Sequence, residues 1–161
     1  LLTMSFSLRL PLLLFLNLPN PNDHHAGQLS FPGGKFEETD YSYQDCALRE
    51  AEEEIGINGS DVGIIGELSS IYIPVSNFLI YPFVGFMGDD PEFTIQRNEV
   101  QNILEIPLKH FLDNKNKKKM DLDVRGQVLK EVPYYDINNQ PLWGASAMIM
   151  SEFEQVIKKI I

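Results

Sequence analysis

The amino-acid sequence predicts an α/β fold of the α+β kind, in which a β-sheet is sandwiched between helices. Segments rich in β-branched and aromatic residues recur along the chain between turn signals. One helical pattern lies between these segments, and a second, amphipathic one closes the chain. A helix buries one stripe and a sheet buries its faces, so this order favours helices packed against the sheet. We expect a single domain over residues 1–161 with a truncated N-terminus, because the sequence starts without methionine.

The strands are predicted from residue type and turn signals. Residues 10–18 (LPLLLFLNL) resemble a targeting signal, but they are too short to span a bilayer. Pro11 and Asn17 also interrupt them, so a buried strand is the better interpretation. Residues 98–103 are expected to be extended or irregular. The predicted strands are residues 12–18, 28–31, 64–72, 78–87, 128–137 and 142–143.

Three helices are predicted from periodicity and end signals. The first covers residues 43–55, where small and aliphatic side chains recur at helical spacing. Residues 40–42 suit the start of this helix, and Gly56 suits a left-handed cap at its end. A short helix is expected over residues 108–112, and a last one over residues 145–160.

Charge and composition narrow the function. The formal net charge of −10 argues against a general nucleic-acid or anionic-membrane partner. A small phosphorylated substrate is still compatible, because a bound dication can reverse the charge locally. The lysine-rich residues 114–119 are expected to form a surface loop, with a handle for substrate phosphates as the alternative. The single cysteine, Cys46, fits the reducing cytoplasm and is interpreted as a packed residue rather than a catalytic thiol.

Three carboxylates gather on one face of the first predicted helix. Glu50, Glu53 and Glu54 stand at i, i+3 and i+4, where like charges repel by about 0.2–0.5 kcal/mol per pair. Arg49 can reach Glu53 at i+4, but one arginine does not balance the cluster. A hard dication, which prefers oxygen ligands, would balance the negative charge of the cluster. The alternative is a solvated acidic face; the glycines in residues 32–34 (PGG) favour a Mg²⁺–pyrophosphate site, because they let the backbone approach closely.

These residues resemble the signature of Nudix hydrolases, G-x5-E-x7-R-E-U-x-E-E-x-G-U, in which U is aliphatic. Residues 49–57 (REAEEEIGI) match its second half at every fixed position. In the first half Asp40 stands in place of Glu, and eight residues rather than seven separate it from Arg49. This expansion, together with residues 27–34 (GQLSFPGG), is similar to the coenzyme A pyrophosphatase branch. Later segments that look like the same branch are residues 72–78, 82–85 and 143–145.

The branch motif differs from this chain upstream of Gly27. It has an arginine four residues before that glycine, where this chain has Asp23. It also has an LLT-x-R-like strand, where this chain has Leu-Phe-Leu followed by Asn17. Such arginines would be natural partners of coenzyme A phosphates.

The resemblance implies a Nudix-type α/β/α sandwich with a mixed central sheet flanked by helices. It implies Mg²⁺, with Mn²⁺ as an alternative, held by the carboxylates of Glu50, Glu53 and Glu54 and by the Gly34 carbonyl. Water would attack one phosphorus of a diphosphate, with Glu53 or Glu99 as the general base. Arg49 would orient Glu53, and Asp40 would fix the junction between the loop and the helix.

The implied substrate is coenzyme A or a derivative, cleaved to 4′-phosphopantetheine and adenosine 3′,5′-bisphosphate. ADP-ribose, a nucleotide sugar or a dinucleotide is the alternative, and a non-catalytic binding module is the alternative of another class. Adjacent histidines point apart and have no third ligand nearby, so His25 suits a substrate or turn role better than zinc. Neither nucleic acid nor membrane is expected as a partner, and the protein is expected to be a monomer or homodimer. The candidate substrate contacts are Gly33, Lys35, His25 and Tyr72.

Overall fold

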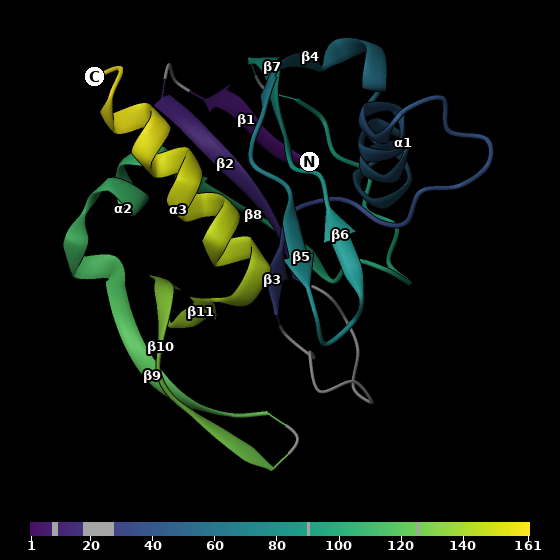
Figure 1. Cartoon of the computed structure of the whole chain (residues 1–161). Coiled ribbons are helices and arrows are strands. Elements are labelled where there is room, and N and C mark those ends of the chain that lie inside the picture. The colour runs from purple at the N-terminus through teal and green to yellow at the C-terminus, as the bar shows by residue number, and fades with distance from the viewer. Residues whose placement is uncertain (8–9, 18–27, 90, 125) are drawn as a thin grey trace.

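A mixed β-sheet lies at the centre of the protein, with helices on both faces (Figure 1). The structure is a computed structural model that describes residues 1–7, 10–17, 28–89, 91–124 and 126–161. Its strands are β1 (Leu2–Ser7), β2 (Leu10–Asn17), β3 (Leu29–Ser30), β4 (Gly63–Glu67), β5 (Ile71–Ile73), β6 (Phe78–Ile80), β7 (Phe83–Asp89), β8 (Asn102–Pro107), β9 (Lys117–Val124), β10 (Gln127–Ile137) and β11 (Gln140–Leu142). Its helices are α1 (Tyr43–Ile55), α2 (Leu108–Leu112) and α3 (Gly144–Lys158), with 3-10 turns at η1 (Gly59–Asp61) and η2 (Asn114–Asn116).

Six strands build the central sheet. Its order is β3-β2-β1-β7-β4, and β8 pairs with the free edge of β2. The pairing of β1 with β7 is parallel, whereas the other ladders are antiparallel, so the predicted mixed sheet is confirmed. Two smaller sheets accompany it, the hairpin β5–β6 and the three-stranded β11-β10-β9.

Strand β2 explains why its sequence reads as an unbroken apolar run. Leu13 and Phe15 belong to the core on one face of the sheet, together with residues of α3. Leu14 and Leu16 belong to the core on the other face, together with residues of α1. A strand that is buried on both faces loses the usual alternation of polar and apolar residues. The predicted sandwich is therefore confirmed, since α1 and α3 cover opposite faces of the sheet (Figure 1).

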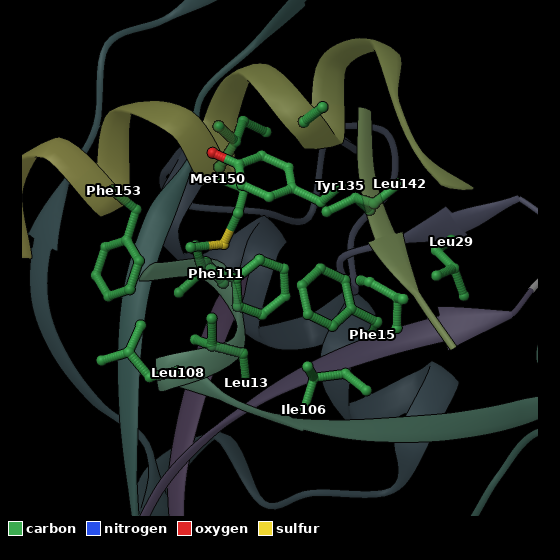
Figure 2. Close-up of a cluster of buried hydrophobic side chains, with 14 of the residues drawn as sticks. Leu13, Phe15, Leu29, Ile106, Leu108, Phe111, Tyr135, Leu142, Met150 and Phe153 are labelled. Carbon is green, nitrogen blue, oxygen red and sulfur yellow. The ribbon is translucent and has the colours of Figure 1, made fainter. Parts of the chain in front are cut away.

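Aromatic rings fill the core beneath α3 (Figure 2). The ring centroid of Phe111, from α2, lies 5.4 Å from that of Phe15 and 5.5 Å from that of Tyr135. Met150 and Phe153 reach this layer from α3. The short helix predicted over residues 108–112 is confirmed, and its buried Phe111 is what anchors it.

Helix α1 has the predicted bounds. The Ser42 side chain caps its start by accepting a hydrogen bond of 3.1 Å from the Asp45 N–H. Gly56 ends it in the left-handed conformation with φ of 70°, and its N–H donates to the Glu52 carbonyl over 2.9 Å. A Cβ at Gly56 would lie 2.7 Å from the Thr94 Cβ, so both the backbone and the packing require glycine here.

Other segments differ from the prediction. The strand expected over residues 64–72 is split into β4 and β5, and the one over residues 78–87 into β6 and β7. Strand β1 was not predicted. The basic loop expected over residues 114–119 is wrong in its second half, because residues 117–119 begin β9. Their ammonium groups are engaged in ion pairs with acidic side chains, namely Glu154, Asp136 and Glu131.

A buried carboxylate joins the β9–β10 hairpin to α3. Glu154 is only 3% exposed and accepts hydrogen bonds from the Lys117 ammonium at 2.5 Å and the Tyr135 hydroxyl at 2.7 Å. Lys158 forms a further ion pair with it at 2.5 Å. Burial alone would raise the pKa of Glu154, but these bonds lower it below its usual value.

The far end of the hairpin projects away from the central sheet (Figure 1). Within the described residues, no helix has the length and apolar character needed to cross a bilayer.

Candidate active site

Arg49 ties the loop before α1 to the helix itself. Its Nε and Nη2 donate to the two oxygens of Asp40 over 2.8 and 3.1 Å, and its Nη1 donates to Glu53 over 3.1 Å. Nη2 also donates to the Lys35 carbonyl over 3.0 Å. The hydrogen bond from Arg49, helped by one from the Glu37 N–H, lowers the pKa of Asp40 to about 2. The structure thus places Asp40 at the junction of loop and helix, and its bidentate pairing with Arg49 fixes the loop geometry.

Two glycines bring the loop against the carboxylates of α1. The Gly33 N–H donates to Glu54 Oε2 over 3.0 Å. The Glu50 carboxylate lies so close to Gly34 that a Cβ there would be 2.3 Å from its Cδ. Gly33 has a φ of 152°, a conformation that side chains disfavour. Only bare glycines therefore allow this approach of backbone and carboxylates.

The protein environment disfavours the ionised form of the two carboxylates on this face. The pKa of Glu54 is raised to about 7, chiefly by burial and also by the charges of Glu50 and Glu99, although the hydrogen bond from Gly33 opposes the shift. Burial also raises the pKa of Glu50, despite the neighbouring Arg49 guanidinium. These shifts mean that the metal-free protein pays for keeping both groups charged.

Backbone hydrogen bonds to the end of α1 bring the segment that contains Glu99 close to this cluster. The Thr94 N–H donates to the Ile55 carbonyl over 2.9 Å, and the Gln96 N–H donates to the Glu54 carbonyl over 3.0 Å. Residues 94–96 are thereby fastened to the C-terminal end of α1, and Glu99 follows in a turn. Its charge raises the pKa of both Glu50 and Glu54.

The carboxylates fit a hard divalent cation. Glu50 and Glu54 are one helical turn apart, and carboxylate oxygens are what Mg²⁺ prefers. Among the residues that the structure describes, no three acidic, histidine or cysteine side chains already converge as metal ligands. In the structure, the Glu50 carboxylate pairs with Arg49, and the Glu54 carboxylate accepts a hydrogen bond from the Gly33 N–H. A dication would offset the cost that the raised pKa values express, after small rotations of these side chains.

The predicted ligands are not all equally placed. Glu50, Glu54 and Gly34 come together, as the glycine contact shows. Glu53 lies on the outer side of the helix, where its side chain is 56% exposed and pairs with Arg49. That pair is the one predicted from the i, i+4 spacing.

A cleft of about 750 Å³ opens beside the glycine loop. Gly33, Gly34 and Lys35 line one part of it, and other parts are lined by the hairpin β5–β6, one face of α1 and the first turns of α3. The Lys35 ammonium lies 5.3 Å from the ring centroid of Phe78 in this hairpin. The cleft therefore adjoins the carboxylate cluster through the same loop.

The other predicted substrate contacts are not seen at this cleft. Tyr72 is not among its lining residues; its hydroxyl donates to Asn77 Oδ1 over 2.9 Å. His25 lies outside the described residues, as do Asp23 and Gly27.

Sequence reasoning missed an aromatic group in the cleft. Tyr43 stacks on Tyr81 with centroids 4.0 Å apart and planes at 10°, and Phe36 packs its edge against Tyr43. All three line the cleft. A signal was present in α1: Tyr43, Cys46 and Ala47 stand at i, i+3 and i+4, and together they line the cleft. The partner Tyr81 comes from a distant turn, which local spacing does not reveal.

Known proteins share both the sequence and the fold of this chain. The profile of the NUDIX domain matches residues 12–124. The chain belongs to the Nudix family. The relative named uncharacterized Nudix hydrolase NudL from Yersinia enterocolitica is 37% identical over 145 residues, covering 88% of this chain and 73% of the relative. The NudL of Yersinia pestis is 33% identical over 147 residues, covering 91% and 73%.

Solved Nudix structures confirm the fold. The Nudix hydrolase RenU of M. smegmatis superposes with a TM-score of 0.66 at 12% identity, covering 99% of this chain and 84% of RenU. The NUDIX domain of Shewanella oneidensis NrtR, solved as a complex with ADP ribose, has a TM-score of 0.55 at 13% identity and coverages of 97% and 85%. This Nudix protein therefore has the α/β/α architecture that its sequence predicts.

Proposed function

We propose that this Nudix protein is a Mg²⁺-dependent hydrolase of coenzyme A or its derivatives. The products are 4′-phosphopantetheine and adenosine 3′,5′-bisphosphate. One observation supports the assignment as a hydrolase: the partly buried Glu50 and the buried Glu54 lie against Gly34 and Gly33, two glycines that line the cleft. Such a site suits a diphosphate, because a dication held there neutralises phosphate oxygens and lowers the pKa of a bound water.

Each residue of the cluster has a role in this proposal. Glu50 and Glu54 are the core metal ligands, with Glu53 and the Gly34 carbonyl completing the set. The Gly33–Gly34 backbone leaves room for the diphosphate. The attacking water forms a bond to one phosphorus, the bridging P–O bond breaks, and the other phosphate leaves as a monoester. The water's proton passes to a carboxylate base.

We propose Glu99 as that base in preference to Glu53. The charge of Glu99 raises the pKa of both Glu50 and Glu54, whereas the Glu53 carboxylate is paired with the Arg49 guanidinium. A base must be free to take the proton of the attacking water, and a carboxylate already paired with a guanidinium is less available for this. Arg49 then serves to orient Glu53 and to hold the loop through Asp40.

The Glu99→Gln variant should lower kcat by about 100- to 10,000-fold, because a general base contributes that much to a transition state. Glu92→Gln, an exposed residue of the same segment, is the matched control and should keep wild-type kcat. If Glu53→Gln gives the large loss and Glu99→Gln does not, the base is Glu53.

Coenzyme A is favoured over other diphosphates by sequence features outside the acidic helix. The expanded spacing between Asp40 and Arg49 and the segment GQLSFPGG at residues 27–34 are those of the coenzyme A pyrophosphatase branch. The relatives named NudL are 37% and 33% identical to this chain over 145 and 147 residues. ADP-ribose is the competing substrate, since the NrtR domain of the same fold was solved with ADP ribose.

A substrate panel tests the proposal. Purified protein with Mg²⁺ should hydrolyse coenzyme A with a kcat/KM at least about tenfold above that for ADP-ribose or a dinucleotide, a difference of about 1.4 kcal/mol in transition-state binding. Chromatography with mass detection should find 4′-phosphopantetheine and adenosine 3′,5′-bisphosphate in equal amounts. Equal or faster turnover of ADP-ribose would rule out the coenzyme A assignment. If the protein hydrolysed none of the diphosphates, the non-catalytic binding module would be the remaining interpretation.

A further inference from the structure

The cleft beside the glycine loop offers one cationic side chain among the described residues that line it. That side chain is Lys35. The other lining side chains are apolar, aromatic or hydroxyl-bearing, with Ser76 in the β5–β6 turn and Ser146 in the first turn of α3 as examples. A volume of about 750 Å³ lies within the range of small-molecule sites.

Lys35 stands at the catalytic end of this cleft. It follows Gly34 directly, and its carbonyl accepts a hydrogen bond from Arg49 over 3.0 Å. Its ammonium lies over the Phe78 ring at 5.3 Å, so the β5–β6 hairpin holds the side chain from the other side. The ammonium is therefore placed to meet a phosphate of the diphosphate itself rather than a group at the far end of the cleft.

The two arms of coenzyme A make opposite demands on such a cleft. The adenosine arm carries an additional 3′-phosphate, which would need a second cation if it were desolvated. The pantetheine arm has no charge beyond the diphosphate; it carries methyl, methylene, amide and hydroxyl groups and ends in a thiol. An apolar lining with scattered hydroxyls suits the second arm and not the first.

Three aromatic rings of the cleft already have a partner against one face. Tyr43 already stacks on Tyr81 at 4.0 Å, and Phe78 already faces the Lys35 ammonium. A base would have to displace one of these partners or use the opposite ring face. The pantetheine arm requires neither.

We infer that the cleft binds the uncharged pantetheine arm of the substrate, with Lys35 contacting the diphosphate, and that the 3′-phosphoadenosine arm lies outside the cleft. This assignment rests on the proposed coenzyme A activity. It makes the hairpin β5–β6 and the first turn of α3 the parts of the fold that select the arm.

Filling the cleft from α3 tests which arm it holds. Ser146 lines the cleft in the first turn of the helix, whereas Met148 on the same helix is 54% exposed and does not line it. Ser146→Trp should weaken binding of 4′-phosphopantetheine by about tenfold or more and change that of adenosine 3′,5′-bisphosphate by less than about twofold. Met148→Trp should leave both dissociation constants at their wild-type values. Calorimetry on the whole protein with each product measures them.

The opposite pattern, in which Ser146→Trp weakens adenosine 3′,5′-bisphosphate alone, would place the nucleotide in the cleft and overturn the inference. An equal effect on both products, or none on either, would overturn it as well. Turnover of coenzyme A by the wild-type protein is read separately. A protein that cleaves coenzyme A but shows the opposite pattern refutes only the arm assignment, whereas a protein that does not cleave it refutes the proposed function.

Lys35 gives an independent check with intact substrates. Lys35→Met should raise KM for coenzyme A and for dephospho-coenzyme A by the same factor, about tenfold, because the lost contact is to the shared diphosphate. A clearly larger rise for coenzyme A would mean that Lys35 contacts the 3′-phosphate, and this would contradict the inferred orientation.

Discussion

Glu54→Gln should abolish diphosphate hydrolysis while making the metal-free protein more stable at pH 8. Glu54 is 8% exposed, and burial raises its pKa from 4.5 to about 7. A folded-state pKa above the unfolded one means that this group stabilises the fold fully below pH 4.5 and loses that contribution as pH rises through 7. Gln copies the neutral carboxyl at every pH. The variant should gain about 2 kcal/mol at pH 8 and nothing at pH 4, after allowance for partial solvation.

Magnesium should reverse this order of stabilities. A cation that binds only the folded wild-type site stabilises it by mass action, and the variant has lost a ligand. The loss of kcat should exceed about 100-fold, since even changes behind a metal ligand cost up to that much. Thermal melts in chelator and in Mg²⁺, at pH 4 and pH 8, measure the stabilities.

The exposed Glu52 on the same helix supplies the control for this experiment. Glu52→Gln should change neither the melting temperature in chelator nor the activity by a measurable amount. A Glu54→Gln protein that melts below wild type in chelator at pH 8 would show that the carboxylate is stabilised in its charged form. Retained activity would remove Glu54 from the metal site.

Gly34→Ala should cost about 100-fold in kcat with little loss of stability. The new methyl group would lie 2.3 Å from the Glu50 Cδ, so the carboxylate has to move. A carboxylate at the end of a flexible side chain can turn away at small cost to the fold, below about 1 kcal/mol. A displacement of about 1 Å in a catalytic group, however, is enough for a 100-fold loss of rate.

The matched control for this variant is Gly66→Ala in β4, where a Cβ would meet no atom within 4 Å. It should keep both the activity and the urea midpoint of the wild type. Full activity in Gly34→Ala would mean that Glu50 tolerates another position, and the glycine would then have no role in placing it.

Local chemistry made much of the site predictable. The bounds of α1 follow from the Ser42 cap and the left-handed Gly56, which act within one turn of the chain. The pair of Arg49 with Glu53 follows from helical spacing. The burial of Glu54 could not be predicted from the sequence, because helical spacing alone does not say which carboxylate turns toward the glycine loop.

Contacts between distant segments set the limit of sequence reasoning. Strand β1 is recognised as a strand only through its pairing with β2 and β7, and Lys117 is part of β9 through its pairing with Tyr135 of β10. Tyr81 enters the cleft by stacking on Tyr43 from the turn after β6. The position of Glu99 beside the cluster was expected from the family resemblance, and no local pattern implies it.

The parallel ladder between β1 and β7 also has a consequence for how the protein folds. Leu2 lies opposite Val84, so the middle of the sheet cannot close until the chain has been made through β7. The backbone bonds from Thr94 and Gln96 to the end of α1 come later still. Contacts so far apart in sequence are slow to form. The acidic helix and glycine loop are synthesised before β7, yet their assembly as a site awaits segments that leave the ribosome dozens of residues afterwards.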